Sequence, residues 1–238
     1  MIGLGVDHVG SVVGGSLPLG GQDVEATIAA VRSTHEAASS LIPLLEDTEA
    51  VCQAVERYRP DILHFCENPV LPSGELHRVE ALVERQKTVR RLFPEIRIMR
   101  SIPIAESGSR LSVPTLQLAE RFAAFSDLLL TDTVLTPSPT HGAGSQPVEG
   151  FVGITGKTCN WDTAALLVAS SGIPVILAGG LGPENVREAV RHVRPAGVDS
   201  CTGTNAVDGD GRPIRFKKDI QRVRRFVAEA LAAAEECK

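Results

Sequence analysis

The sequence predicts an α/β protein, a parallel (β/α) barrel that forms one domain over residues 1–238. Short apolar runs alternate along the chain with longer amphipathic segments, which is the pattern of parallel strands joined by helical crossovers. The run Pro174–Ala178 is apolar at nearly every position, as in a strand that helices cover on both faces. The length also fits, because one such barrel commonly takes about 250 residues.

Seven apolar runs are predicted as strands. Each is short, rich in aliphatic residues and bounded by polar or turn-forming residues. In chain order they are Val6–Val13, Ser39–Leu45, Asp61–Cys66, Ile96–Pro103, Asp127–Thr133, Pro174–Ala178 and Gly197–Thr202.

The segments that follow these runs are predicted as helices, because their apolar residues recur at intervals of three and four. They are Asp23–Arg32, Thr48–Tyr58, Arg78–Leu92, Val113–Phe125, Asp162–Ser170, Pro183–Val193 and Lys218–Ala233.

The stretches richest in Gly, Pro and Ser all follow predicted strand ends. Barrel enzymes build their active sites from the loops at the carboxyl ends of the strands, so this side is predicted to be the functional face. The longest of these stretches is either a lid or a disordered connector. The stretches are Gly14–Gly21, Asn68–Gly74, Pro103–Pro114 and, as the longest, Val134–Gly150.

Composition excludes several classes of function. The net charge is -5 and the chain has no dense Lys/Arg tract, so no nucleic-acid partner is expected. The small group Arg215, Lys217 and Lys218 is interpreted as a solvated basic edge next to a helix start. No apolar run approaches the roughly 20 residues that span a bilayer, so no membrane partner is expected.

The five cysteines follow neither disulfide nor metal-ligand spacing. The sequence therefore predicts reduced thiols, a cytoplasmic protein and no metal site. These cysteines are Cys52, Cys66, Cys159, Cys201 and Cys237.

A glycine-rich turn, residues 153–158 with the sequence GITGKT, precedes the predicted helix at Asp162. Backbone amides freed by glycine, together with a helix amino terminus, form a good seat for a phosphate group. The turn also resembles the end of a nucleotide-binding P-loop. That motif requires a glycine where Phe151 stands, so a P-loop is disfavoured.

Two more small-residue turns follow the last two predicted strands, Gly179-Gly180 and Thr202-Gly203. Barrel enzymes recurrently bind phosphate with the loops after strands seven and eight. The sequence therefore predicts a phosphate site here. The alternative is that these glycines only permit tight turns.

Several segments resemble the phosphoribosylanthranilate isomerase family in order and spacing. The matches are most specific in the last third of the chain and weaker upstream. The specific ones are residues 153–161, 174–186 and 197–203, and Lys218-Asp219-Ile220 with Phe226; the weaker ones are residues 127–133, 61–66 and 5–10.

This resemblance implies a ribulose-phosphate-binding barrel that catalyses an Amadori rearrangement in tryptophan biosynthesis. The reaction converts an aminoaldose phosphate to an aminoketose phosphate without a cofactor. The implied partner is a small phosphorylated sugar, and phosphate or sulfate ions would occupy the same seat. The implied phosphate- and substrate-binding residues are Gly153, Thr155, Gly156, Gly179, Gly180, Asp199, Cys201, Thr202 and Gly203.

Asp132 matches the family's catalytic aspartate, and the resemblance implies that it is the acid that opens the ribose ring. Alternation places Leu128, Leu130 and Asp132 on one face of a strand, so an inward carboxyl group at the barrel mouth is reasonable. There it could hold a raised pKa. The alternative is a carboxylate that caps the following turn.

The family's base, a cysteine at the end of its first strand, has no match here, and Gly14–Gly21 lacks the family's carboxylate-binding arginine. His64 and Cys66 share one face of their strand and are the candidate bases. The alternatives are a core histidine and a buried apolar thiol. Further unassigned candidates near strand ends are His8, Glu67 and Arg100.

Three functions stay open at this point. One is an isomerase acting on this or another phosphosugar, and another is a non-catalytic phosphosugar-binding or regulatory barrel that has lost its base. An indole-glycerol-phosphate-synthase relative is disfavoured, because no convincing inward lysines are present. The first barrel strand is predicted to be missing, since Met1–Gly5 looks like the last turn of a helix. Either the chain begins upstream, or a second copy in a homo-oligomer covers the open edge.

Overall fold

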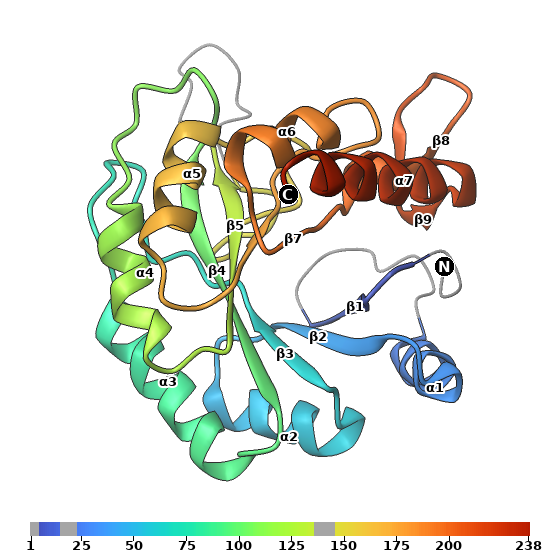
Figure 1. Ribbon diagram of the computed structural model, residues 1–238. Helices are drawn as coiled ribbons and strands as arrows, with labels where there is room; N and C mark the ends of the chain where they lie inside the picture. Colours follow the sequence, from blue (N-terminus) through green and yellow to red (C-terminus); the bar gives the residue numbers. More distant parts are fainter. Residues whose placement is uncertain (1–4, 15–22, 136–145) are drawn as a thin grey trace.

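The structure is a computed structural model in which residues 5–14, 23–135 and 146–238 are described (Figure 1). Its main element is a parallel sheet in the order β1-β2-β3-β4-β5-β6-β7, which confirms the seven predicted strands. Figure 1 shows that this sheet curls as a half-barrel. The strands are β1 (His8–Gly14), β2 (Ala38–Leu44), β3 (Ile62–Phe65), β4 (Arg97–Ala105), β5 (Leu128–Val134), β6 (Val175–Leu177) and β7 (Gly197–Val198).

Helices cover the outer face of the curled sheet (Figure 1). Several begin after an Asp or Asn whose side chain accepts a hydrogen bond from the first turn, as Asp23, Asp47 and Asn160 do. The helices are α1 (Val24–Thr34), α2 (Thr48–Tyr58), α3 (Val79–Leu92), α4 (Thr115–Ala123), α5 (Trp161–Ser170), α6 (Val186–Val193) and α7 (Ile220–Glu236).

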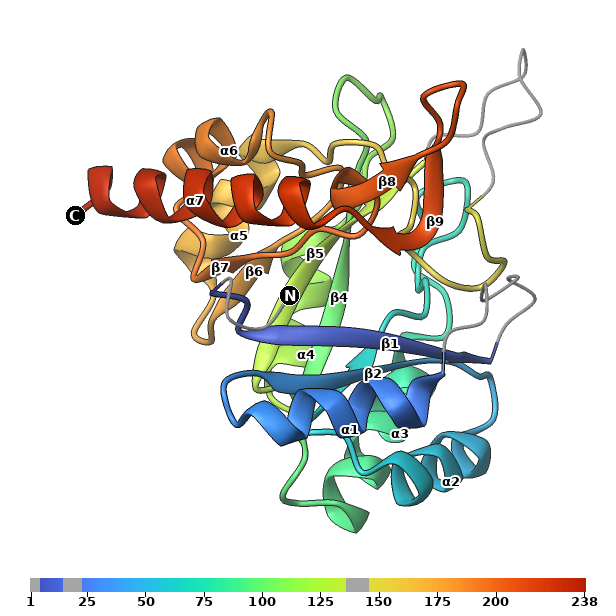
Figure 2. The same cartoon turned by 90° about the vertical axis from the view of Figure 1, so that its right-hand side faces the viewer.

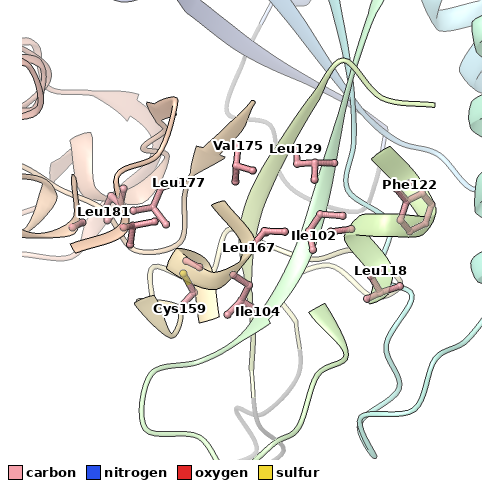
Figure 3. Packing of buried hydrophobic residues seen from close by; sticks show 14 of the residues in the cluster. Ile102, Ile104, Leu118, Phe122, Leu129, Cys159, Leu167, Val175, Leu177 and Leu181 are labelled. Carbon is pink, nitrogen blue, oxygen red and sulfur yellow. The ribbon is translucent and has the colours of Figure 1, made fainter. Parts of the chain in front are cut away.

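A large apolar cluster fixes the middle strands to their helices (Figure 3). Ile102 and Ile104 of β4 point outward and pack with Leu118 and Phe122 of α4 and with Leu167 of α5. All five are fully buried. Each such side chain contributes roughly 1.5–3 kcal/mol, so the scaffold below the functional face is firmly held.

The inward face of the same strands changes from apolar to polar along its length. In each of three strands, an apolar residue is followed two positions later, on the same face, by a polar one. These pairs are Ile62 and His64, Met99 and Ser101, and Leu130 and Asp132. Polar groups therefore begin where the strands approach their carboxyl ends. The apolar layer below them consists of Ile62, Met99, Leu130 and Ala178.

The segment after β7 differs from the prediction. The predicted strand Gly197–Thr202 ends at Val198, and a short 3-10 helix, η1 (Thr202–Thr204), follows it. An antiparallel hairpin comes next, β8 (Asn205–Val207) and β9 (Pro213–Lys218). The Asp208 carboxylate accepts hydrogen bonds from two backbone amides of the connecting turn and so stabilises it.

The hairpin also corrects the prediction for the basic residues near the last helix. Lys218 was predicted to open that helix, but it ends β9, and Asp219 caps α7 instead. Arg215 and Lys217 are exposed residues of β9 shortly before α7 begins, which agrees with a solvated basic edge next to a helix start.

Side chains tie β1 to the far side of the half-barrel. His8 Nε2 of β1 lies 3.5 Å from Oδ1 of Asp199, the residue after β7. Phe216 of β9 packs on a cluster that includes Val12 of β1 and Leu44 of β2. Figure 2 shows α7 and the hairpin facing β1 across the open side. Within the described residues, no backbone ladder joins β1 to β7.

Some predicted features lie outside the described residues. These are most of the loop Gly14–Gly21, the centre of the candidate lid Val134–Gly150 and nearly all of the expected helix end Met1–Gly5. In the part of the chain that is described, no helix is both long and apolar enough to cross a membrane.

Candidate active site

Asp132 lies near the carboxyl end of β5, where its half-buried side chain faces the interior. Burial raises its pKa from 3.8 to about 7, and the charge of Asp199 adds to this effect. The hydrogen bond donated by the Thr133 amide, at 3.1 Å, opposes this effect, and the nearby Ser101 hydroxyl also lowers the pKa. This carboxyl group can therefore hold a proton near neutral pH and give it up there.

The Gly153 backbone lies directly on the Asp132 carboxylate. A Cβ at position 153 would stand 2.4 Å from Asp132 Oδ2, and the residue has φ +105, so only glycine fits here. Just before it, the Val152 amide donates a hydrogen bond to the Cys66 carbonyl at 2.8 Å. The end of β3 thus helps to place the turn against the acid.

The three predicted glycine turns meet one another. A Cβ at Gly180 would lie 2.5 Å from the Lys157 carbonyl carbon, and one at Gly203 would lie 2.0 Å from the Leu181 carbonyl oxygen. At Gly156 a Cβ would be in ordinary contact with the Thr202 side chain, at 3.4 Å. We call these joined turns, residues 153–158, 179–182 and 201–203, the glycine cradle.

Hydrogen bonds fix the glycine cradle to its surroundings. The Thr133 hydroxyl, next to the acid, donates to the Lys157 carbonyl at 2.7 Å. The Ser200 hydroxyl donates to the Leu181 carbonyl at 2.7 Å, and Arg222 Nε of α7 donates to the Gly203 carbonyl at 2.9 Å. Asn160 accepts a hydrogen bond from the amide of Thr163 and caps α5 behind the first turn. The cradle is thus continuous with the strand that carries Asp132.

Asp199 is a second carboxylate in the interior, directly after β7. Its burial would raise its pKa, but the hydrogen bond with His8 and the nearby positive charges outweigh burial and hold the pKa below its usual value. Burial likewise disfavours the charged His8 imidazole, yet Asp199 raises its pKa overall. Asp132 and Asp199 therefore differ in protonation near neutral pH.

Lys218 closes the base of the last turn. Its ammonium group donates to the carbonyls of Ser200, at 3.1 Å, and Cys201, at 2.5 Å, and to the Thr204 hydroxyl, at 2.9 Å. Burial lowers the Lys218 pKa, and burial raises the pKa of the Cys201 thiol beside it. The lysine thus stabilises the turn while keeping a positive charge near Asp199.

The two candidate bases, His64 and Cys66, both lie in the interior, on the face that alternation predicts. Burial raises the pKa of the Cys66 thiol well above its usual value, so the thiol keeps its proton. Burial lowers the His64 pKa to about 4, and its Nε2 lies 2.8 Å from the Ser101 hydroxyl oxygen. His64 is therefore neutral, but its Nε2 already has a partner.

Glu67 and Arg100 lie away from the inward face. Arg100 is 0% exposed, and its guanidinium group lies 4.2 Å from the Phe122 ring centroid under α4. Glu67 pairs with Arg100 and with Arg85 of α3, at 2.6 Å in each case. This buried network fixes the end of β3, which in turn holds the Gly153 turn.

Sequence reasoning missed two residues near the site. Ser101 could have been found by alternation, since it stands between Met99 and Pro103 on the inward face. The contact of Lys218 with the last turn was missed because the sequence analysis placed this residue at the start of the last helix. The Gly209-Asp210-Gly211 tract between two short apolar runs was the available signal for a hairpin. Among the described residues, no group of three or more His, Cys, Asp or Glu could hold a metal ion.

Comparison with known sequences gives a consistent result. The family described as N-(5'phosphoribosyl)anthranilate (PRA) isomerase matches residues 46–229. N-(5'-phosphoribosyl)anthranilate isomerase 1 of Methanosarcina mazei is 31% identical over 195 residues, which covers 82% of this chain and 72% of that protein. N-(5'-phosphoribosyl)anthranilate isomerase of Methanosarcina acetivorans is 28% identical over 208 residues, which covers 87% of this chain and 76% of that protein.

Solved structures show the same fold. A phosphoribosyl anthranilate isomerase from Thermotoga maritima superposes with a TM-score of 0.62 at 20% identity, covering 97% of this chain and 91% of that one. An isomerase in complex with reduced 1-(o-carboxyphenylamino)-1-deoxyribulose 5-phosphate gives 0.63 at 17% identity, covering 97% and 90%.

Proposed function

Because this chain belongs to the N-(5'-phosphoribosyl)anthranilate isomerase family, we propose that it catalyses the aldose–ketose isomerisation of N-(5'-phosphoribosyl)anthranilate in tryptophan biosynthesis. One observation carries the proposal. The Asp132 carboxyl group, with a pKa near neutrality, touches the edge of a continuous glycine cradle. An acid next to an anion seat is what the isomerisation of a sugar phosphate requires.

The acid step is assigned to Asp132. Its proton passes to the ring oxygen of the ribose, the bond between that oxygen and C1 breaks, and the nitrogen lone pair forms a C=N bond. A base then removes the proton from C2, and the C–H electrons form a C1–C2 double bond as the nitrogen recovers its lone pair. The resulting enol tautomerises to the ketone. No atom is gained or lost, and no cofactor takes part.

The base step is assigned to Asp199 in place of the two residues predicted from the sequence. The buried Cys66 thiol keeps its proton, and His64 is engaged by Ser101. Asp199 is ionised, is about a third exposed toward the interior and is paired with His8. Two carboxyl groups whose surroundings push their pKa values apart are a common acid–base arrangement.

The phosphate group is assigned to the glycine cradle. Gly153, Gly179 and Gly180 have positive φ and pack closely on their neighbours, which holds the turns together. Backbone amides of such turns can bind an anion. Lys157, an exposed residue of the first turn, adds a positive charge. The residues assigned to the phosphate are Gly153, Thr155, Gly156, Gly179, Gly180, Cys201, Thr202 and Gly203.

The assignments are tested by steady-state turnover of N-(5'-phosphoribosyl)anthranilate by the wild type, Asp132→Asn and Asp199→Asn. We expect each substitution to lower kcat about 10²–10⁴-fold with little change in the affinity for phosphate. Activity of the wild type should fall as the pH rises through about 7, because Asp132 then loses the proton it must donate. Full activity of Asp132→Asn would rule out its role as acid.

The second candidate function is a non-catalytic barrel that binds a phosphosugar. The glycine cradle alone supports it, since that cradle needs neither carboxyl group. Calorimetry with ribose 5-phosphate separates the two functions. Binding without any turnover by the wild type would favour the non-catalytic barrel.

We also propose that a second copy covers the open side between β1 and β7, where both edge strands lack a neighbour among the described residues. A solved Thermotoga maritima structure is of monomers generated from a dimeric phosphoribosylanthranilate isomerase. Light scattering on the purified chain tests this, and a monomer at all concentrations would refute it. A biosynthetic reaction and cysteines without disulfides fit a cytoplasmic location.

A further inference from the structure

The Ser101 hydroxyl lies between the proposed acid and a buried imidazole. Its oxygen is 2.8 Å from His64 Nε2. On the same inward face, the register pairs Ser101 with Leu130 and Pro103 with Asp132, so the hydroxyl is a neighbour of the Asp132 carboxyl group and favours its ionised form. The three residues come from β3, β4 and β5, and the central strand β4 is hydrogen-bonded to each of the other two. Ser101 is 0% exposed and His64 is 8% exposed, so water does not compete for the bond between them.

The protonation of Asp132 determines the direction of the hydrogen bonds in the row Asp132, Ser101 and His64. When Asp132 is ionised, the Ser101 hydroxyl donates to it and can accept from the His64 Nε2–H. When Asp132 is protonated, its own O–H can donate to Ser101, whose proton then points to His64 Nε2. Burial lowers the His64 pKa to about 4, so the imidazole is neutral and can act as donor or acceptor.

We infer that Ser101 and His64 are positioning residues that orient the Asp132 carboxyl group and stabilise the carboxylate left when it gives up its proton. The inference rests on the proposed role of Asp132 as the acid. It gives His64 a role through Ser101 rather than contact with the substrate.

Other charged groups also act on the row Asp132, Ser101 and His64. The charges that act on His64 are those of Asp199 after β7, His8 of β1, Arg100 of β4 and Glu67 just after β3. Asp199 also acts on Asp132, and its negative charge favours the protonated acid. The Thr133 amide and the Ser101 hydroxyl favour the ionised form. Removing the Ser101 hydroxyl thus takes a stabilising group from the Asp132 carboxylate, while the repulsion from Asp199 stays the same. The thiols that Asp132 influences are Cys66, Cys159 and Cys201.

The test is a titration that does not depend on turnover. The protein is labelled with ¹³C at the aspartate side-chain carboxyl carbons, and the Asp132 signal is the one that Asp132→Asn lacks. We expect Ser101→Ala to raise the pKa of Asp132 by about one unit, the size expected for a lost hydrogen bond to a charged group. Ser101→Thr keeps the hydroxyl and should restore the wild-type titration.

Two further variants complete the design. Ser40→Ala is the matched control, because Ser40 is about as buried, but its hydroxyl has no hydrogen-bond partner among the described residues. The Asp132 titration of this variant should equal that of the wild type. His64→Leu should also raise the pKa of Asp132, by less than Ser101→Ala. It serves as the readout if Ser101→Ala fails to fold.

The outcomes separate this inference from the proposed function. An Asp132 titration that is unchanged in both Ser101→Ala and His64→Leu overturns the inference, even if the wild type is an active isomerase. If the wild type shows no turnover but Ser101→Ala or His64→Leu shifts the Asp132 titration, the positioning role is supported and the isomerase is refuted. In an active enzyme, Ser101→Ala should also lower kcat more than it changes KM.

Discussion

The two sides of the half-barrel are held together in different ways. On the carboxyl-terminal side, backbone packs on backbone, as where Gly203 meets the Leu181 carbonyl and Gly180 meets Lys157. On the amino-terminal side, β1 reaches the β7 half through side chains, chiefly His8 with Asp199 and Phe216 with Val12. Substitutions on the carboxyl-terminal side should therefore destabilise the fold strongly through steric clashes. Substitutions on the amino-terminal side should have moderate effects, some of which depend on pH and salt.

The largest expected effect is that of Gly203→Ala. A Cβ there would lie 2.0 Å from the Leu181 carbonyl oxygen and 2.8 Å from the Gly182 Cα, which are backbone atoms that cannot move aside cheaply. We expect a loss of about 2–3 kcal/mol in the free energy of unfolding. The affinity for ribose 5-phosphate should fall at least about tenfold, or about 1.4 kcal/mol in binding free energy, because the clash pushes apart two turns of the proposed phosphate site.

Gly209→Ala is the control for this change. Gly209 lies a few residues later in the hairpin turn, and a Cβ there would meet nothing within 4 Å. Urea unfolding and calorimetry should find it within about 0.5 kcal/mol of the wild type. Equal effects of the two substitutions would show that backbone contact does not hold the cradle together.

A smaller effect is expected for Phe216→Ala, which removes an apolar link between the hairpin and β1. Phe216 is half-buried and packs with the cluster that includes Val12, Leu44 and Cys66. Its φ of +60 is unusual for a residue with a side chain and indicates that packing holds it there. We expect a loss of about 1–2 kcal/mol in thermal or urea unfolding.

The control for the Phe216 change is Val207→Ala on β8, because Val207 is 54% exposed. Its effect should stay within about 0.5 kcal/mol. If both variants unfold like the wild type, the hairpin contributes nothing to closing the open side, and the contrast between the two sides would need another basis.

The same contrast explains how much the sequence could predict. The strands and the glycine cradle were predictable, because continuous apolar runs and glycines at fixed spacing reflect backbone constraints that few other residues satisfy. Asp132 was predictable as an inward residue by alternation, and the structure places it against the cradle. The cradle's role in binding phosphate and the role of Asp132 as acid stay predictions.

The remaining features depend on contacts between distant segments. Nothing local in the sequence pairs His8 with Asp199 or places Ser101 between His64 and Asp132. Glu67 and Arg100 looked like site residues near strand ends. They lie instead in an outward network with Arg85, because the register of β4 turns Arg100 toward α4. The hairpin β8–β9 was missed because helical spacing was extended back to Lys218.

The smallest expected effect, and the one most dependent on conditions, is that of His8→Ala. Burial alone would lower the His8 pKa, but Asp199 raises it, so folding favours the charged imidazole. That contribution is present below the unfolded pKa of His8 and is lost as the pH rises through its higher folded pKa. The Asp199 pKa is lowered, so its contribution is present above its unfolded pKa and is lost as the pH falls.

The His8–Asp199 pair should therefore stabilise the fold most between roughly pH 4 and 6.5. Because both side chains are partly exposed, we expect a difference between His8→Ala and the wild type of only about 0.5–1 kcal/mol in that window. The difference should shrink above neutral pH and in high salt. Urea unfolding across pH, with His35→Ala as control because His35 has no charged partner among the described residues, measures it. A difference independent of pH would show that His8 acts by packing alone and would make β1 more like the cradle side.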